Sequence, residues 1–292
     1  MSTLWQNIQY KMLRSGNKLN LLIGINVAVF LIINVSAILE QLFFTGFGNS
    51  NILSFAVEYL RMPASFQALL KHFWTPITYM FMHDGVLHIL FNMLWLYWMG
   101  QIFEEYLGNK RTIGLYIMGG LAGALFYLLA YNLLPAFTSL HAANFALIVG
   151  ASASVMAIVV ATATLLPNYT ISLILFGPVK LKWLVFVILV IDFLGVVGPN
   201  AGGEIAHLGG ALLGFVYIKQ LQRGHDWIGS IGNIFKASPK LKVVAKNSNK
   251  NSAEYPRQDE IDRILDKISQ SGYDSLTKQE KEILFRASNN ES

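Results

Sequence analysis

The class of fold is decided by residues 113–134, which read IGLYIMGGLAGALFYLLAYNLL. The stretch carries no charged side chain, and it matches the roughly 20 apolar residues that a helix needs to cross a bilayer. A backbone inside a bilayer must satisfy its own hydrogen bonds, and a helix does so within one segment. Residues 113–134 are therefore expected to form a transmembrane helix.

Five further stretches are apolar over a similar length. Hydrophobic residues make up 54% of the chain and charged residues only 13%, whereas a soluble domain carries about 25% charged residues. The mean hydropathy is +0.46. We expect an all-α membrane protein, a bundle of six transmembrane helices. The other five expected spans are Leu19–Leu39, Val86–Phe103, Phe145–Leu166, Leu181–Val197 and Ile205–Leu221.

The basic residues indicate the orientation of these spans, because Lys and Arg accumulate in cytoplasmic loops. They lie before the first span, in the second and fourth loops and in the tail, whereas the third and fifth loops hold none. Both termini are therefore expected in the cytoplasm. The net charge of +5 fits contact with anionic membrane lipids rather than nucleic acid, because it flanks apolar segments. The chain has no cysteine, which excludes disulfides, thiolate metal sites and cysteine nucleophiles.

Composition also divides the chain. We expect a cytoplasmic N-terminal segment at residues 1–18, the six-span domain at 19–222, a basic linker at 223–256 and a helical hairpin at 257–292. Gly272 can end the first helix of the hairpin, and Thr277 with Glu280 fits a capping box that starts the second. The sequence names no partner for this tail. The long first loop, residues 40–75, mixes apolar and polar residues and is expected to lie in the membrane interface.

Polar residues inside apolar spans are costly and tend to be functional. Ser152 lies near the outer end of the fourth expected span, and His207 lies early in the sixth. Ala206, Gly210 and Gly214 recur every four residues, which makes a ridge that allows close helix packing. If this ridge meets the fourth span, His207 comes within hydrogen-bond reach of Ser152, and a serine becomes a nucleophile when such a base activates it. The plainer interpretation is a serine at a helix contact and a histidine bonded to a carbonyl.

His88 and Asn92 are four residues apart at the start of the second span, so they share one helix face. Both side chains can donate hydrogen bonds, which suits stabilisation of an oxyanion. A lone polar residue there would be read as a contact between helices. His83 is expected at the entry to this helix, where it can orient the other two.

The residues from His83 to Asn92, HDGVLHILFN, resemble the rhomboid pattern of two histidines five apart and then an asparagine. The stretch GAS at residues 150–152 resembles the nucleophile motif of that family, and AHLGG at residues 206–210 resembles its catalytic histidine motif. The resemblance covers residues 19–222. It implies a six-span rhomboid bundle that acts as an intramembrane serine protease and needs neither metal nor cofactor.

The resemblance also assigns roles. It makes Ser152 the nucleophile and His207 the general base of a dyad, without an acidic third member, so Asp192 is read as structural. His88, Asn92 and the Ser152 backbone N–H would form the oxyanion hole. The supporting positions are His83, Gly150 and Met156, and Met156 stands where the family often has a tyrosine. Ala153 stands where it usually has a glycine.

The implied substrates are single-span membrane proteins, cut near the outer face of the bilayer. The tail resembles an extension found on some bacterial rhomboids and implies a bacterial plasma membrane. Two other functions stay open at this point. One is a catalytically inactive rhomboid-like protein that binds membrane helices. The other is a proton-coupled transporter, which predicts internal repeats or broken helices at the midplane.

Overall fold

The computed structural model describes residues 18–173, 177–229 and 258–288. The chain divides into two compact units, with the boundary near residue 237. Residues 1–17 of the expected N-terminal segment and residues 230–256 of the expected linker lie outside the described residues. The elements of the first unit are α2 (Lys18–Glu40), η2 (Gln41–Thr45), α3 (Asn51–Leu60), β1 (Met62–Pro63), α4 (Phe66–Lys71), α5 (Thr75–Thr78), η3 (Tyr79–Phe81), α6 (Val86–Leu107), α7 (Asn109–Leu133), α8 (Pro135–Thr138), η4 (Ala142–Asn144), β2 (Leu147–Ile148), α9 (Ser152–Leu165), β3 (Thr170–Leu173), β4 (Gly177–Lys180), α10 (Leu181–Gly195) and α11 (Ala201–Gln222).

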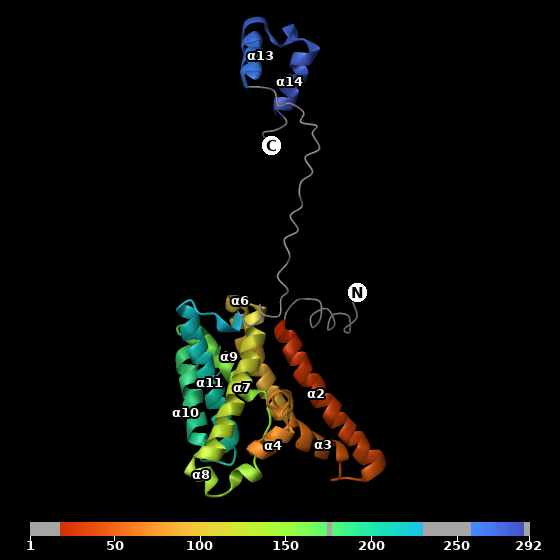
Figure 1. The fold of residues 1–292 in the computed structure, drawn as a ribbon, viewed down its shortest axis with the longest axis vertical. Helices are drawn as coiled ribbons and strands as arrows, with labels where there is room; N and C mark the ends of the chain where they lie inside the picture. Colours follow the sequence, from red (N-terminus) through yellow and green to blue (C-terminus); the bar gives the residue numbers. More distant parts are fainter. Residues whose placement is uncertain (1–17, 174–176, 230–257, 289–292) are drawn as a thin grey trace. The chain divides into compact units, whose positions relative to one another are not determined.

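Each of the six expected spans falls on a helix of this unit. Among the described residues, four helical segments are long and apolar enough to cross a bilayer: α2 with η2, α6, α7 and α11. The prediction of an all-α membrane bundle is therefore confirmed. Helix α2 stands at an angle to the other spans, and the short helices α3 and α4 lie between its far end and the bundle (Figure 1).

The other two helices are short, at 14 residues for α9 and 15 for α10. The expected start of the fourth span at Phe145 is wrong, because α9 begins at Ser152. Leu147 and Ile148, which precede it, are extended instead of helical, because β2 pairs with β1 and sets Ile148 opposite Met62. Hydropathy cannot detect this pairing, because it depends on a strand in the first loop.

Helix α9 is the centre of the bundle, and each of its residues from Ala153 to Ala163 is buried. The predicted ridge on α11 packs against it. A Cβ added at Gly210 or Gly214 would collide with the backbone of α9, at Ala153 and Ala157 respectively. Since only glycine allows this approach, the expected meeting of the fourth and sixth spans is confirmed.

The described segment after α11 packs on the bundle. Asp226 accepts a hydrogen bond from Arg111 Nε at 2.8 Å and one from the Tyr217 hydroxyl at 3.1 Å. Ile228 is buried, against the space left by Gly114 on α7. Residues 223–229, which the sequence assigns to the linker, therefore belong to the packed unit.

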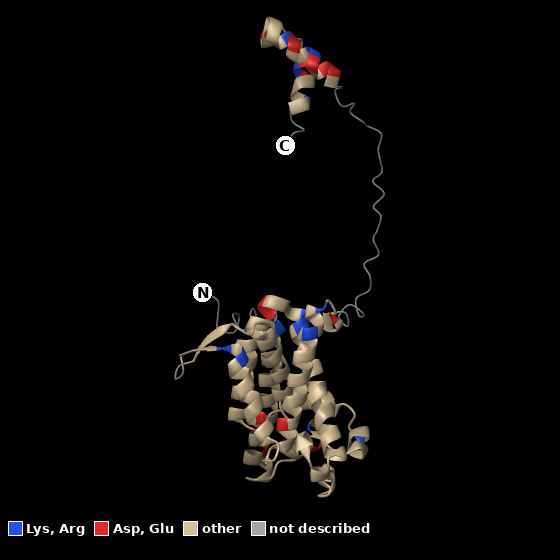
Figure 2. Ribbon diagram, turned by 90° about the vertical axis from the view of Figure 1, so that its left-hand side faces the viewer, with Lys and Arg blue, Asp and Glu red and all other residues tan. Residues whose placement is uncertain are grey.

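Charged side chains are distributed unevenly over the bundle. Most of its Lys and Arg residues gather at one end of the helices, the end with the β3–β4 hairpin (Figure 2). In that hairpin the strands are antiparallel, with Thr170 opposite Lys180. The pattern matches the expected asymmetry of the loops.

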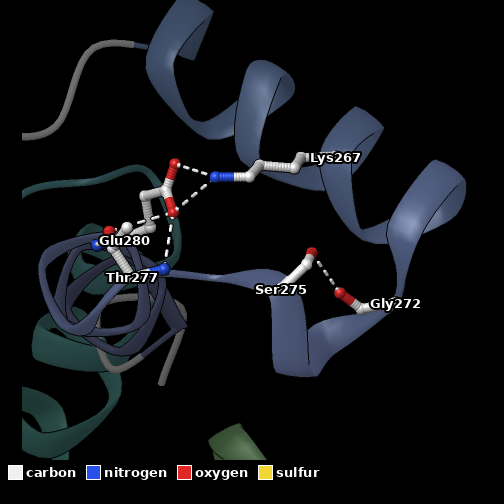
Figure 3. A network of polar contacts seen from close by, with 5 residues as sticks. All are labelled: Lys267, Gly272, Ser275, Thr277 and Glu280. Atoms are coloured by element: carbon white, nitrogen blue, oxygen red, sulfur yellow. Dashed lines mark hydrogen bonds and ion pairs between the residues drawn. The ribbon is translucent and has the colours of Figure 1, made fainter.

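The second unit is a helical hairpin of α13 (Gln258–Ser271), η5 (Tyr273–Ser275) and α14 (Lys278–Ser288). Gly272 follows α13 with a φ of +76°, and this conformation ends the helix as predicted. The predicted capping box is present: the Thr277 N–H donates to Glu280 Oε2 at 2.7 Å, and the Glu280 N–H donates to Thr277 Oγ1 at 3.3 Å. Lys267 Nζ also bonds both oxygens of Glu280, which ties the two helices together (Figure 3).

Candidate active site

A cavity of about 440 Å³ lies among α6, α9, α10 and α11. Its apolar lining comes mainly from α6 and α9, including Phe91, Trp95 and Val159. Its polar side chains converge from all four helices and from the turn before α11: His88, Asn92, Ser152, Asp192, Asn200 and His207. An apolar pocket with a few convergent polar groups is the usual form of a binding or catalytic site.

Ser152 is the first residue of α9, so the backbone N–H groups of this first turn have no partner inside the helix. The positive end of the helix dipole also lies here, which favours negative charge. The preceding turn depends on Gly150, whose φ is +127°. A Cβ at Gly150 would lie 2.8 Å from both Cε1 and Nε2 of His88. Glycine is therefore required for the backbone conformation and for the close approach of the His88 ring.

His207 projects from α11 into the same cavity. Its Nδ1 atom lies 3.3 Å from Glu204 Oε2 and 3.5 Å from Asp192 Oδ2. Since Nδ1 faces these two carboxylates, Nε2 is the ring nitrogen left to exchange a proton with a ligand. No direct hydrogen bond joins Ser152 to His207 in the described part of the chain. Such bonds are often long without substrate and tighten in the reacting complex.

His88 and Asn92 share a face of α6, as their spacing predicts, and both line the cavity. The Asn92 side-chain amide donates to the His88 carbonyl oxygen at 2.9 Å, which fixes the amide and leaves its second N–H to donate elsewhere. The His83 ring lies edge-on to the His88 ring, with centroids 5.0 Å apart. Burial, and to a lesser extent His88, lowers the pKa of His83 to about 4, so His83 is neutral at pH 7.

The structure thus brings Ser152, His207, His88, Asn92 and Met156 together around one cavity. Gly150 and His83 do not line it, but each contacts His88.

The sequence interpretation missed Glu204, and it assigned Asp192 only a structural role. The signal for Glu204 was its position three residues before His207, since residues three apart lie on one helix face.

The apolar helices and the polar cavity among them define the class, a multi-pass membrane protein of the helical-bundle type. Residues 70–223, more than half of the chain, match the rhomboid domain. The chain belongs to the rhomboid family. Residues 247–290 match a family of unknown function, DUF6576.

Known relatives share only part of their length with this chain. RHOMBOID-like protein 12, mitochondrial, from Arabidopsis thaliana is 30% identical over 157 residues, which are 51% of this chain and 47% of the relative. Rhomboid protease GlpG from Salmonella newport and that from Salmonella heidelberg are each 31% identical over 75 residues, 20% of this chain and 27% of the relative. The chain therefore spans about half the length of the plant protein and about a quarter of the bacterial ones.

Proposed function

We propose that this chain is an intramembrane serine endopeptidase in which Ser152 is the nucleophile and His207 the general base. The observation that carries the proposal is the position of Ser152, which starts α9 in a cavity shared with His207, His88 and Asn92. The name of the Salmonella relatives, rhomboid protease, adds support.

In the proposed reaction, Ser152 Oγ attacks the scissile carbonyl carbon while His207 Nε2 takes the hydroxyl proton. The negative charge that develops on the carbonyl oxygen is stabilised by the Ser152 N–H, His88 and Asn92. Loss of one such donor costs about 10²- to 10³-fold in kcat in a soluble protease. His207 then gives the proton to the leaving amine, and water releases the acyl group in a second step that uses the same residues.

The proposed substrates are single-span membrane proteins cut near the outer face, because a transmembrane helix must loosen before its peptide bonds can be attacked. The proposed location is the plasma membrane, with both termini in the cytoplasm. The Lys and Arg residues at one end of the bundle support this orientation (Figure 2). Residues 19–222 would then act as the protease domain and residues 257–292 as a cytoplasmic extension.

A serine-directed fluorophosphonate probe tests the proposal on the full chain in detergent. We expect the wild type to be labelled and to cleave a model single-span substrate, and Ser152→Ala and His207→Ala to do neither. The double variant should be no worse than either single one, because the two residues act as a unit. Full cleavage by Ser152→Ala would refute the assignment, and substrate binding without labelling or cleavage would favour the inactive helix-binding protein.

A further inference from the structure

We propose that Glu204 and Asp192 position His207 and stabilise its charged form, so that the reaction runs on a histidine held by two carboxylates rather than on an unsupported dyad. This inference rests on the proposed function of Ser152 and His207. It assigns a role to two residues whose side chains come from different helices, α10 for Asp192 and α11 for Glu204.

The geometry is specific to one atom of the ring. His207 Nδ1 lies 3.3 Å from Glu204 Oε2 and 3.5 Å from Asp192 Oδ2, and facing atoms of the three side chains all lie within 4.8 Å of one another. Both Asp192 Oδ2 and His207 Nδ1 are buried, and neither makes a hydrogen bond among the described residues, so the contacts of Nδ1 with the two carboxyl groups lie at ion-pair distance. A carboxylate buried among apolar helices is costly unless a positive or hydrogen-bonding group faces it. His207 is the group that faces both.

Neighbouring residues hold Glu204 in this position. Asn200 Nδ2 donates to Glu204 Oε1 at 3.2 Å, which leaves Oε2 for His207. A Cβ at Gly195 would lie 3.0 Å from Glu204 Cγ, a tight contact, so glycine at residue 195 eases the fit of this side chain against the end of α10. The spacing of three residues between Glu204 and His207 places both on one face of α11.

The chemical consequence follows from the proton on Nδ1. An acceptor at Nδ1 keeps the proton there, so that Nε2 is unprotonated and can accept the proton of Ser152. When Nε2 takes that proton the ring becomes an imidazolium, and a nearby negative charge stabilises it. In Ser-His-Asp proteases, replacing the aspartate by asparagine leaves the geometry intact and lowers kcat by about 10⁴-fold through the wrong tautomer. Two carboxylates here share that task.

Side chains of the other helices also surround His207. His88 on α6 lines the same cavity. Helix α9 brings Ser152, and α7 brings Tyr127, whose ring lies against Gly202 on α11. Among the described residues that face His207, only Asp192 and Glu204 are carboxyl groups.

The test compares Glu204→Gln, Asp192→Asn and the double variant with the wild type in the full chain. Active sites are counted by fluorophosphonate labelling, so that unfolded protein does not contribute. We expect each single variant to lose about 3- to 30-fold in kcat and the double variant about 10²- to 10⁴-fold, the upper end being the loss known for a missing triad aspartate. The control is Glu105→Gln, which removes an exposed carboxylate from α6 and should leave kcat unchanged.

The pH dependence separates positioning from packing. Removing a carboxyl group that faces the base should shift the acidic limb of the kcat/KM profile, because that limb reports the ionisation of the essential base in the free enzyme. A packing role would lower the number of labelled sites and leave the limb in place, and that result would overturn the inference. Activity lost to EDTA and restored by Zn²⁺ would also overturn it, because the three side chains would then be metal ligands. If the wild type is not labelled at Ser152, the proposed function fails first.

Discussion

Gly123 on α7 lies where the helix that carries Ser152 meets the helix that carries His207. A Cβ at this position would lie 2.5 Å from the Ala153 Cβ and 2.8 Å from the Ala206 carbonyl oxygen. These two residues directly adjoin Ser152 and His207 in the chain. The substitution Gly123→Ala therefore inserts one methyl group between the supports of the proposed nucleophile and base.

The expected displacement follows from these distances. Ordinary van der Waals contact begins at 3.4 Å. If α7 stays in place, α11 must move away from the new methyl group by about 0.6 Å and α9 by about 0.9 Å. Overpacking of this kind costs about 1–3 kcal/mol, which corresponds to a fall in Tm of roughly 2–10 °C for a domain of this size. A misplacement near 1 Å can cost about 100-fold in rate, so we expect kcat to fall roughly 10- to 100-fold.

The assay measures Tm in detergent and cleavage of a single-span substrate per labelled active site, on one preparation. Gly119→Ala is the matched control, because it lies one turn earlier on α7, and the three atoms nearest to its added Cβ all belong to α9, with the Ala157 Cβ nearest. We expect a similar fall in Tm from the control and a smaller loss of kcat. Unchanged kcat for Gly123→Ala, together with a lowered Tm, would show that the spacing of α9 and α11 does not set the rate.

Three further predictions concern other parts of the chain. Asn92→Ala should lower kcat by about 10- to 1,000-fold with KM nearly constant if the amide stabilises the oxyanion, whereas unchanged turnover with a lower Tm would leave His88 as the only proposed side-chain donor. In the cysteine-free chain, Ser139→Cys should react with an impermeant thiol reagent added outside the cell and Asn168→Cys should not; the reverse pattern would invert the proposed topology. In the tail, hydrogen bonds from Lys267 and then from Thr277 lower the pKa of Glu280 from its ordinary value of 4.5 to about 2. The hairpin should therefore lose stability as the pH falls from about 4.5 to 2, read as faster amide exchange in α13 and α14 of the full chain. Glu280→Gln should exchange faster already at neutral pH, whereas Glu282→Gln, whose partner is the exposed Arg286, should behave like the wild type.

Much of the bundle could be predicted because the bilayer imposes simple rules on length and polarity. The spans near α6, α7 and α11 follow from apolar runs alone, and the contact between α9 and α11 follows from small residues every four positions. The Thr277–Glu280 capping box could be predicted for a similar reason, because its two residues are only three positions apart in the sequence. These features all depend on neighbours within one helix.

Features that depend on distant segments could not be read in the same way. The start of α9 was misplaced because residues 147–148 pair with residues 62–63, a contact that no local pattern encodes. Glu204 was missed because an acidic residue in the first turn of a helix already has an ordinary explanation, the favourable interaction with the helix dipole. Only the fold shows that His207 and Asp192 lie beside it. The candidate residues of the cavity were found through their motifs, whereas the partners of His207 Nδ1 required the structure.

The burial of α9 from Ala153 to Ala163 has a further consequence for how the protein fits its bilayer. A helix that touches lipid must match the thickness of the hydrocarbon layer or tilt to fit it. Every residue of α9 from Ala153 to Ala163 is covered by protein. The length of this helix, 14 residues, therefore has to fit the neighbouring helices and not the thickness of the hydrocarbon layer. Bilayers of different thickness should therefore act first on the outer helices, such as α2 and α10, whose apolar side chains are widely exposed. The helix that begins at Ser152 is separated from the lipid by the helices packed around it.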